Sequence, residues 1–212
     1  MTRVTWIGST ARAAVAGDSP AESEDERIVL LSPEGEAIGV APKRASHHRE
    51  TPLHLAFSCY LVDDAGRVLM TRRAHHKPTW PSVLTNSCCG HPAPGESLRA
   101  AVRRRVGQEL GLHVGEMTLI LPEFGYRATM SNGVVEYELC PVVRAAATGS
   151  VAPDPEEVAE AEWWDWTDCV RLRNAEEASP WFRDQMVQLV PLGGPAEWPE
   201  ASVDRLPPAI AW

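Results

Sequence analysis

Residues 90–112 constrain the fold more than any other part of the sequence. Within them, apolar residues recur at the spacing of one helix face, at Leu98, Ala101, Val102, Val106 and Leu110. Gly111 then stands where a helix C-terminus favours glycine. The preceding residues 73–95 are rich in Pro, Gly, His and Trp and have no periodicity, and a loop of that length inside a compact domain is usually functional. The sequence therefore predicts a functional loop that leads into a half-buried helix.

The same stretch resembles the Nudix box, whose pattern runs Gly, five residues, Glu, seven residues, Arg-Glu-apolar-x-Glu-Glu-x-Gly-apolar. The residues that fall in this register are Gly90, Glu96, Arg104, Val106, Glu109, Gly111 and Leu112. Arg105 and Gln108 stand where two of the glutamates should be. Nudix pyrophosphohydrolases use those carboxylates to hold hard divalent cations, which prefer oxygen ligands. We therefore do not expect this chain to hydrolyse a diphosphate.

Further motifs, spread over roughly residues 27–190, resemble the type I isopentenyl-diphosphate isomerases. They lie at 54–58 (HLAFS), 71–74 (TRRA), 80–81 (WP), 85–92 (TNSCCGHP), 95–97 (GES), 126–128 (YRA) and 136–138 (EYE). Ser82 and Leu84 depart from a more usual glycine and aromatic residue. The resemblance implies an α/β protein, a Nudix-type α/β/α sandwich with a mixed central sheet. It also implies an isomerase that interconverts isopentenyl and dimethylallyl diphosphate through a tertiary carbocation.

Composition limits the class of protein. The 212 residues, 44% of them hydrophobic, suffice for one domain with a core, and no run approaches the roughly 18 to 20 apolar residues of a membrane span. Five cysteines without disulfide spacing and no secretory signal favour the cytoplasm. A net charge of −9 argues against nucleic acid. The expected partner is a small prenyl diphosphate, not a membrane, and the sequence leaves the oligomeric state open, with a monomer as the simplest expectation.

Three segments are expected along the chain. Residues 1–26 are small, polar and acidic, typical of a disordered leader, and 27–190 carry the Nudix-like domain. Residues 191–212 are an irregular tail containing proline and tryptophan. Within the domain we expect a hairpin around the turn 32–35, strands at 54–62 and 134–143, an Asn-Gly hairpin turn at 131–133, and short helices near 167–173 and 180–190.

Histidines and glutamates suggest a metal site. Three histidines from different segments, His47, His54 and His91, suit a borderline divalent ion, and Glu136 and Glu138 share one face of a strand. Taken alone, these residues are more typical of surface or core histidines and of the solvent-exposed face of a strand than of a metal site. The resemblance implies that all five hold one ion, Mn²⁺, Mg²⁺ or Zn²⁺, and that Glu109 helps to hold a separate Mg²⁺ against the substrate diphosphate.

The proposed chemistry needs proton-transfer groups on two faces of the substrate. Isomerisation adds a proton at the terminal methylene and removes another from the methylene nearest the diphosphate end. Cys89 is a candidate because the pKa of a thiol moves readily with its neighbours. The resemblance implies Glu138 as the opposite partner, with Tyr126 hydrogen-bonded to that carboxylate. Cys88 is expected to be buried and to pack in the core, like Cys59, Cys140 and Cys169.

The remaining candidates bind the two ends of the substrate. Trp181 matches a family Ser/Thr-Pro-Trp element, and an indole face can stabilise a cation. The chain has only two lysines among its 20 basic residues. By resemblance Lys43, Arg73, Lys77 and Arg105 contact the diphosphate, whereas Arg103 and Arg104 are expected to be solvated.

Two other functions compete with the isomerase. The chain could be a Nudix hydrolase of nucleotide or prenyl diphosphates, which Arg105 and Gln108 weigh against. It could also be a non-catalytic Nudix-like binding module, although such a module has no reason to keep Cys89, Tyr126 and Glu138 together.

Overall fold

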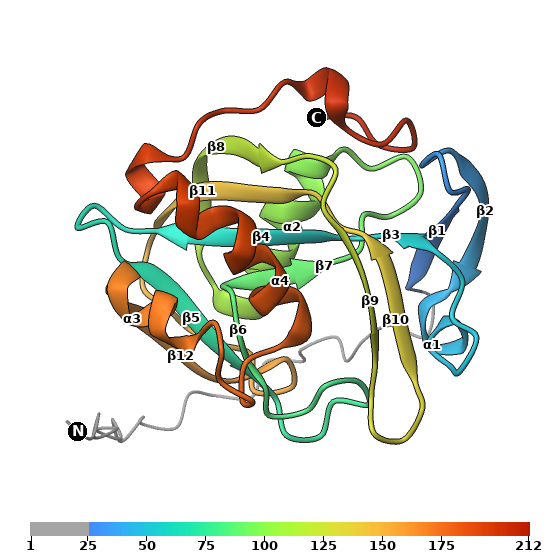
Figure 1. The fold of residues 1–212 in the computed structure, drawn as a ribbon, viewed down its shortest axis with the longest axis horizontal. Coiled ribbons are helices and arrows are strands. Elements are labelled where there is room, and N and C mark those ends of the chain that lie inside the picture. The colour runs from blue at the N-terminus through green and yellow to red at the C-terminus, as the bar shows by residue number, and fades with distance from the viewer. Residues whose placement is uncertain (1–25) are drawn as a thin grey trace.

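The structure is a computed structural model that describes residues 26–212 (Figure 1). The predicted acidic leader, apart from its last residue, lies outside the described residues. The strands of the described part form two sheets, of five and seven strands.

The larger sheet has the main strand order β12-β5-β4-β11-β8, and β6 and β7 pair with β5 and β4. Its strands are β4 (Phe57–Val62), β5 (Val68–Arg73), β6 (Leu84–Thr85), β7 (Cys88–Gly90), β8 (His113–Leu121), β11 (Val142–Thr148) and β12 (Val158–Trp164). β4 and β11 run parallel, and the other printed pairs of this sheet are antiparallel. The sheet is therefore mixed, as predicted.

The smaller sheet has the order β2-β1-β3-β10-β9, with β3 parallel to β10. Its strands are β1 (Arg27–Leu31), β2 (Ala37–Pro42), β3 (His54–Leu55), β9 (Gly125–Thr129) and β10 (Val135–Leu139). The predicted hairpin β1–β2 is present, and the Asn-Gly turn joins β9 to β10, with Gly133 at φ +87°. Glycine is favoured at that angle because glycine has no Cβ atom.

Two predicted strands are each divided between the sheets. Residues 54–62 become β3 and β4, and residues 134–143 become β10 and β11. The breaks lie side by side, because the backbone N–H of Ala56 donates to Leu139 O at 2.9 Å and that of Ser58 to Pro141 O at 3.0 Å. The two sheets therefore meet at this point, and residues on both sides of the break can face one site.

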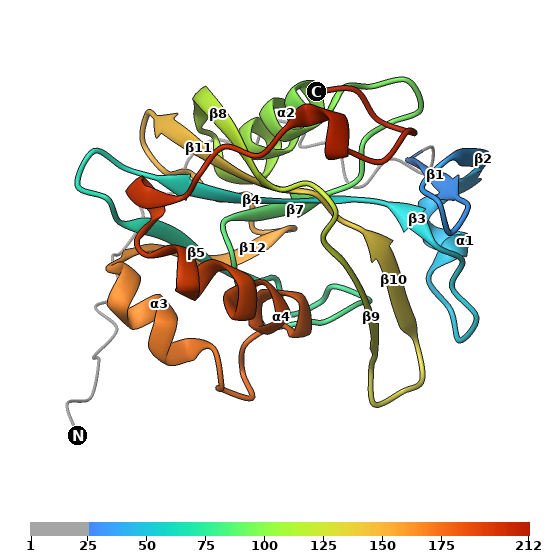
Figure 2. The same ribbon diagram turned by 45° about the horizontal axis from the view of Figure 1, so that its top comes forward.

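Helices cover both faces of the larger sheet (Figure 2). Helix α2 (Leu98–Leu110) packs on one face over Phe57, Cys59 and Leu61. α3 (Trp166–Leu172) and α4 (Pro180–Leu189) lie on the other face, where Tyr60 is buried. Alternate residues of β4 thus feed two cores, as strand geometry requires. The predicted α/β/α sandwich is confirmed.

Caps and turns define the remaining elements. Ser97 caps α2, its hydroxyl accepting from Ala100 N at 3.3 Å, and Gly111 ends that helix at φ +66°. The short helix α1 (Lys43–Ser46) follows β2, and 3₁₀ turns lie at Val190–Leu192, Pro195–Glu197 and Val203–Arg205.

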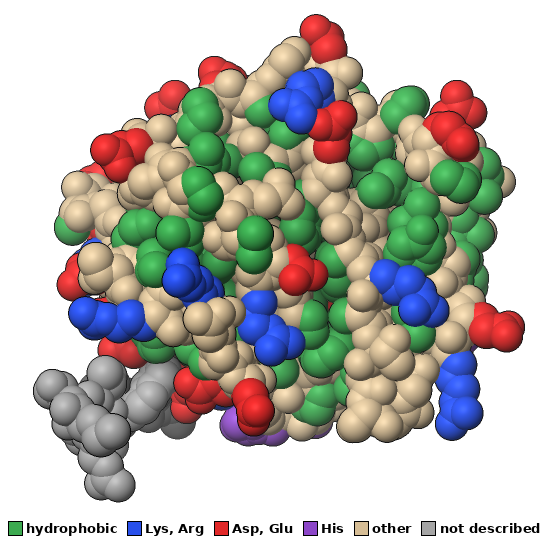
Figure 3. All heavy atoms as spheres, in the orientation of Figure 1, with side chains coloured by type: hydrophobic (Ala, Val, Ile, Leu, Met, Phe, Trp, Pro, Cys, Tyr) green, Lys and Arg blue, Asp and Glu red, His purple; other side chains and the backbone are tan. Residues whose placement is uncertain are grey.

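Residues 191–212 are largely irregular but packed against the rest of the molecule. Ala201 N donates to Leu119 O and Leu98 N donates to Ala211 O, both at 2.8 Å. The Arg99 guanidinium lies 4.5 Å from the ring centre of Trp212. Within residues 26–212, none of the helices has the length and apolar character to cross a membrane. On the face shown in Figure 3, lysines and arginines form separate small groups among acidic side chains.

Candidate active site

A cavity of about 540 Å³ lies where the two sheets meet. Its lining includes the predicted cations Lys43, Arg73, Lys77 and Arg105 together with Cys89, Tyr126, Glu136, Glu138 and Trp181. These residues come from α1, α2, α4, the strands β5, β7, β9 and β10, and the loop after β5. The structure thus brings into one space residues more than 130 positions apart in the chain.

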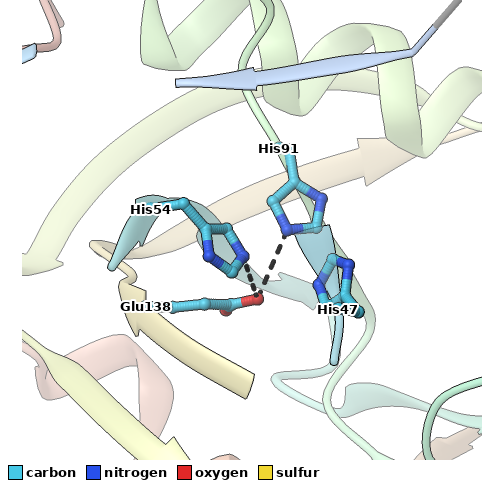
Figure 4. A group of neighbouring side chains, drawn as sticks. All are labelled: His47, His54, His91 and Glu138. Carbon is cyan, nitrogen blue, oxygen red and sulfur yellow. Dashed lines mark hydrogen bonds and ion pairs between the residues drawn. The ribbon is translucent and has the colours of Figure 1, made fainter. Parts of the chain in front are cut away.

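Four of the predicted metal ligands converge at one side of this cavity (Figure 4). Ligand atoms of His47, His54, His91 and Glu138 all lie within 4.8 Å of one another. Glu138 Oε1 lies 3.4 Å from His54 Nε2 and 3.3 Å from His91 Nε2. Strand pairing explains the closeness of the first pair, because Glu138 stands directly opposite His54 in the parallel β10–β3 register.

Hydrogen bonds to backbone carbonyls orient two of the rings. His54 Nδ1 lies 2.9 Å from Pro52 O, and His47 Nδ1 lies 3.1 Å from Lys43 O. A carbonyl oxygen only accepts hydrogen bonds, so each Nδ1 carries the proton. In the neutral ring the Nε2 atom then carries a lone pair, which is the arrangement typical of metal-binding histidines. The lone pair of His54 then faces a carboxylate oxygen. A proton or a metal ion between the two atoms relieves their repulsion, and three imidazoles with one carboxylate form a donor set that fits a divalent metal ion.

Burial and mutual contact shift the pKa values of this group. Burial lowers the pKa of His91 to about 3, and it also lowers the pKa of His47. Burial opposes charge on Glu138, but the bonds to His54 and His91 hold its pKa well below the usual value. For His54 the same contact with Glu138 outweighs burial and raises the pKa. The group therefore presents a carboxylate and, at His47 and His91, neutral rings, which are the forms that ligate metals.

Glu136 lies beside this group. It is buried on the same face of β10 as Glu138, as the sequence predicted, but it is not one of the four converging ligands. Burial, reinforced by the charge of Glu138, raises the pKa of Glu136 to about 7. The Tyr126 hydroxyl donates to Glu136 Oε2 at 2.9 Å. The role of Glu136 as a fifth ligand stays a prediction.

The expected bond of Tyr126 to Glu138 is therefore wrong. Tyr126 stands opposite Glu138 in the antiparallel β9–β10 register, but its hydrogen bond is with Glu136, two residues along that strand. A tyrosine side chain is long enough to reach the diagonal neighbour on the adjacent strand, which explains the bond to Glu136.

Strand alternation separates the two adjacent cysteines. β7 pairs with β4 so that Cys89 lies opposite Ser58 and Cys88 opposite Cys59. Cys88 is buried in the core beneath α2, whereas Cys89 lines the cavity. Cys89 Sγ lies 3.3 Å from Asn86 Oδ1 and 3.4 Å from Ser58 Oγ. Burial raises the pKa of Cys89 to about 12, so the thiol form dominates.

Trp181 begins the aromatic wall of the cavity. Its ring centre lies 5.7 Å from that of Tyr126 and 6.0 Å from that of Trp80, whose ring meets it edge to face at 86°. The residue stands in the first turn of α4, which Ser179 caps through its hydroxyl and which Pro180 begins. The helix start thus fixes the position of the indole.

Carboxylates accompany three of the four predicted diphosphate-binding cations. Lys43 lies 2.9 Å from Glu26, and Lys77 lies 2.8 Å from Glu157. Arg105 lies 2.6 Å from Glu109 and 3.5 Å from Glu157; burial acts against its charge, but these carboxylates outweigh it and raise its pKa. Arg73 donates to Thr79 O at 3.2 Å. The cations are therefore held in place, and their role in diphosphate binding stays a prediction.

Several residues that support the site were not among the residues predicted from the sequence. Arg104 is not simply solvated, as the sequence had suggested. It donates two hydrogen bonds to Glu96, at 2.8 and 2.7 Å, and one to His91 O, at 3.1 Å. These bonds connect the loop between β7 and α2, which carries His91, to helix α2. The matching Glu and Arg of the Nudix register were a signal for this pair. Asn86 and Gln185 gave no periodic signal, although Asn86 lies within the 85–92 motif.

Comparison with known proteins places the chain in a family. The NUDIX domain profile matches residues 52–185. A protein of Saccharopolyspora erythraea named isopentenyl-diphosphate Delta-isomerase is 53% identical over 187 residues, covering 87% of this chain and 96% of its own. A protein of the same name from Rhizobium rhizogenes is 50% identical, covering 90% of this chain and 93% of its own. The chain belongs to the NUDIX isopentenyl-diphosphate Delta-isomerases.

Solved structures support the fold of this isomerase family member. A protein from Deinococcus radiodurans superposes with a TM-score of 0.58 at 18% identity, covering 77% of this chain and 98% of its own. A MutT NUDIX hydrolase from Burkholderia pseudomallei gives a TM-score of 0.51 at 20% identity, covering 65% of this chain and 98% of its own. At these identities the likeness concerns the fold alone. In this isomerase the box position of Gln108 is exposed, whereas Arg105 is buried against Glu109.

Proposed function

We propose that this chain interconverts isopentenyl and dimethylallyl diphosphate, by adding and removing protons through a tertiary carbocation. The observation that carries the proposal is the composition of the single cavity described above. Cys89, Tyr126, Glu138 and Trp181 line it together with four cations suited to a diphosphate. The names of the relatives at 50–53% identity agree with this chemistry.

Proton transfer is assigned to Cys89 and Glu138 on opposite faces of the substrate. The Cys89 thiol is largely protonated because burial disfavours the thiolate, so it can give a proton to the alkene carbon. Glu138 is ionised and can accept a proton from the methylene next to the diphosphate end. Tyr126 supports this side by its hydrogen bond to Glu136, and the pKa of Glu136, raised to about 7, lets that carboxyl take up or release a proton near neutral pH.

The hydrocarbon end of the substrate is assigned to the aromatic wall. A tertiary carbocation next to the indole face of Trp181 gains about 2 kcal/mol when water is excluded. The rings of Tyr126 and Trp80 both pack against the ring of Trp181. The wall also keeps water away from the cation, which would otherwise be captured as an alcohol.

A divalent ion is assigned to His47, His54, His91 and Glu138, with Glu136 as a proposed fifth ligand. Mn²⁺, Mg²⁺ and Zn²⁺ are the candidates, because imidazole and carboxylate ligands suit them. When bound, the ion supplies positive charge that fixes the Glu138 carboxylate and tunes its basicity. A separate Mg²⁺ is assigned to Glu109 at the diphosphate end, since Mg²⁺ commonly bridges one or two carboxylates and substrate phosphates.

The diphosphate end is assigned to Lys43, Arg73, Lys77 and Arg105. Lysine binds phosphate as a point charge, and arginine presents a planar fork. We further propose that the substrate is taken up by a cytoplasmic monomer, that residues 27–190 form the catalytic unit, and that neither nucleic acid nor a membrane is a partner.

Incubation of the purified protein with isopentenyl diphosphate in deuterated water tests the proposal. We expect dimethylallyl diphosphate to form with deuterium in its new methyl group, which NMR detects directly. Phosphate release is measured in parallel, because a hydrolase would release phosphate without moving the double bond. Hydrolysis without isomerisation would replace the isomerase with the hydrolase alternative, and the absence of both reactions would favour a binding module.

Replacing Arg105 tests whether the altered box binds diphosphate. We expect Arg105→Gln to raise the Michaelis constant at least about tenfold, since a hydrogen bond to a charged group contributes roughly 1.5–3 kcal/mol. Steady-state kinetics with isopentenyl diphosphate give the constant. The neighbouring Arg103→Gln is the control, because Arg103 is exposed and should leave it unchanged. Equal Michaelis constants in both variants would show that Arg105 serves only to neutralise Glu109 and Glu157.

A further inference from the structure

The side-chain amide of Asn86 joins the two groups to which the reaction is assigned. The Cys89 thiol donates to Asn86 Oδ1 at 3.3 Å, and the Trp181 indole N–H donates to the same oxygen at 3.2 Å. The Thr85 hydroxyl donates to it as well, at 2.9 Å. One buried oxygen thus receives hydrogen bonds from the thiol and from the indole. Asn86 itself does not line the cavity and is fully buried.

The orientation of this amide is fixed by its other end. Asn86 Nδ2 donates to Cys59 O at 3.1 Å and to Cys88 O at 3.0 Å. A carbonyl oxygen only accepts, so the nitrogen must face these two atoms and the oxygen must face Cys89 and Trp181. A flipped amide would put oxygen against two carbonyls and nitrogen against two N–H or S–H donors. The backbones of β4 and β7 therefore determine where the accepting oxygen lies.

The two groups have few other polar contacts. The structure gives the Trp181 N–H no other hydrogen bond within residues 26–212, and the thiol has only Ser58 as a second side-chain partner. Ser58 Oγ in turn accepts from Gln185 Nε2 at 2.8 Å, and the Gln185 amide oxygen accepts from the buried Tyr60 hydroxyl at 2.8 Å. These supports come from α4 and β4, whereas Asn86 is the one side chain among residues 26–212 that hydrogen-bonds both the thiol and the indole.

We propose that Asn86 is a positioning residue that sets the thiol of Cys89 and the indole face of Trp181 relative to each other. The inference rests on the proposed function. Isomerisation needs the proton donor in line with the terminal methylene and the indole over the neighbouring tertiary carbon. A single acceptor shared by both groups holds that relation constant. A displacement of about 1 Å in such a site can cost roughly 100-fold in rate.

Kinetics of Asn86→Ala test the proposal against a purely structural role. We expect kcat to fall about 100-fold and the Michaelis constant to change less than about threefold, because the diphosphate contacts are untouched. Thr71→Val is the matched control. The Thr71 hydroxyl is equally buried and donates to the backbone carbonyl of Asn86 at 2.8 Å, so its loss removes one hydrogen bond from the same residue without freeing the amide.

A spectroscopic measurement supplies a readout that does not need turnover. The exchange rate of the Trp181 indole proton is followed by NMR, with the signal assigned by its absence in Trp181→Phe. We expect exchange at least about tenfold faster in Asn86→Ala than in the unmodified protein or in Thr71→Val, because the proton loses its acceptor. Asn86→Ser, whose hydroxyl can donate to one carbonyl but does not reach the indole, replaces Asn86→Ala if the latter does not fold.

The outcomes separate the two proposals. A fall in kcat with faster indole exchange supports the positioning role. If the unmodified protein isomerises its substrate and Asn86→Ala retains kcat within about threefold, the positioning role is overturned and the isomerase stands. The positioning role is also overturned if Asn86→Ala and Thr71→Val lose kcat to the same extent and in proportion to the fall in their melting temperatures. Absence of isomerisation in the unmodified protein overturns the proposed function itself, and unchanged indole exchange would then show that the contact with Asn86 is also wrong.

Discussion

Cys89→Ala is expected to lower kcat by about 10²- to 10⁴-fold, the usual contribution of a positioned acid or base. The Cys89 side chain lines the cavity and carries the only thiol there within residues 26–212. Rates are measured with isopentenyl diphosphate at saturating concentration, so that a change in binding does not hide the effect. The Michaelis constant should change little, because the diphosphate contacts lie elsewhere.

Cys88→Ala is the natural control for this substitution. Cys88 is adjacent in sequence, but the alternation of β7 directs its side chain into the core beneath α2. We expect it to lower the melting temperature, because a buried side chain is shortened, and to retain most of the activity. Equal losses of kcat from both substitutions would mean that the loop acts as a packing element and that the thiol of Cys89 transfers no proton.

Removal of metal is expected to abolish isomerisation. Chelation followed by dialysis should leave no measurable turnover, and added Mn²⁺, Mg²⁺ or Zn²⁺ should restore it. The physical reason is that His47, His54, His91 and Glu138 place their ligand atoms within 4.8 Å of one another, a donor set that fits a divalent cation. Turnover and metal content per chain, by elemental analysis, are measured on the same samples.

His91→Ala should lower the metal content measured in this way, because the site loses one ligand. His48→Ala is the control: His48 is adjacent to the ligand His47 but is exposed, and its Nδ1 accepts from Glu50 N. Active, extensively dialysed protein without bound metal would contradict the whole assignment. A loss of metal in Glu136→Ala as large as in His91→Ala would add Glu136 to the ligands.

Local pattern accounts for what could be predicted of the fold. The apolar spacing of residues 98–110 and Gly111 specified α2, and the Asn-Gly turn specified the β9–β10 hairpin, because both signals are complete within a few residues. The divisions of residues 54–62 and 134–143 could not be predicted in this way. Each strand changes sheets only because the other does so beside it, and such a pairing is a contact between distant parts of the chain.

The residues of the site, like the fold, could be predicted only where the signal is local. Register in the Nudix box, the paired cysteines and the EYE motif identified the residues, since residue type and short spacing are properties of the sequence. Strand periodicity also predicted that Glu136 and Glu138 share a face. Which of the two meets the histidines was decided by the parallel register that sets Glu138 opposite His54, and the Tyr126 hydroxyl bonds the other carboxylate, Glu136.

The sequence by itself determined the family, the helix of the box and the set of candidate residues, because these depend on residue types and on spacings within single elements. Only the tertiary structure decided that Glu138 rather than Glu136 meets the histidines, that carboxylates accompany Lys43, Lys77 and Arg105, and that one amide contacts both thiol and indole. These relations depend on distances between side chains from different elements. Such distances are fixed by how the two sheets and α4 pack together, and no local pattern encodes them.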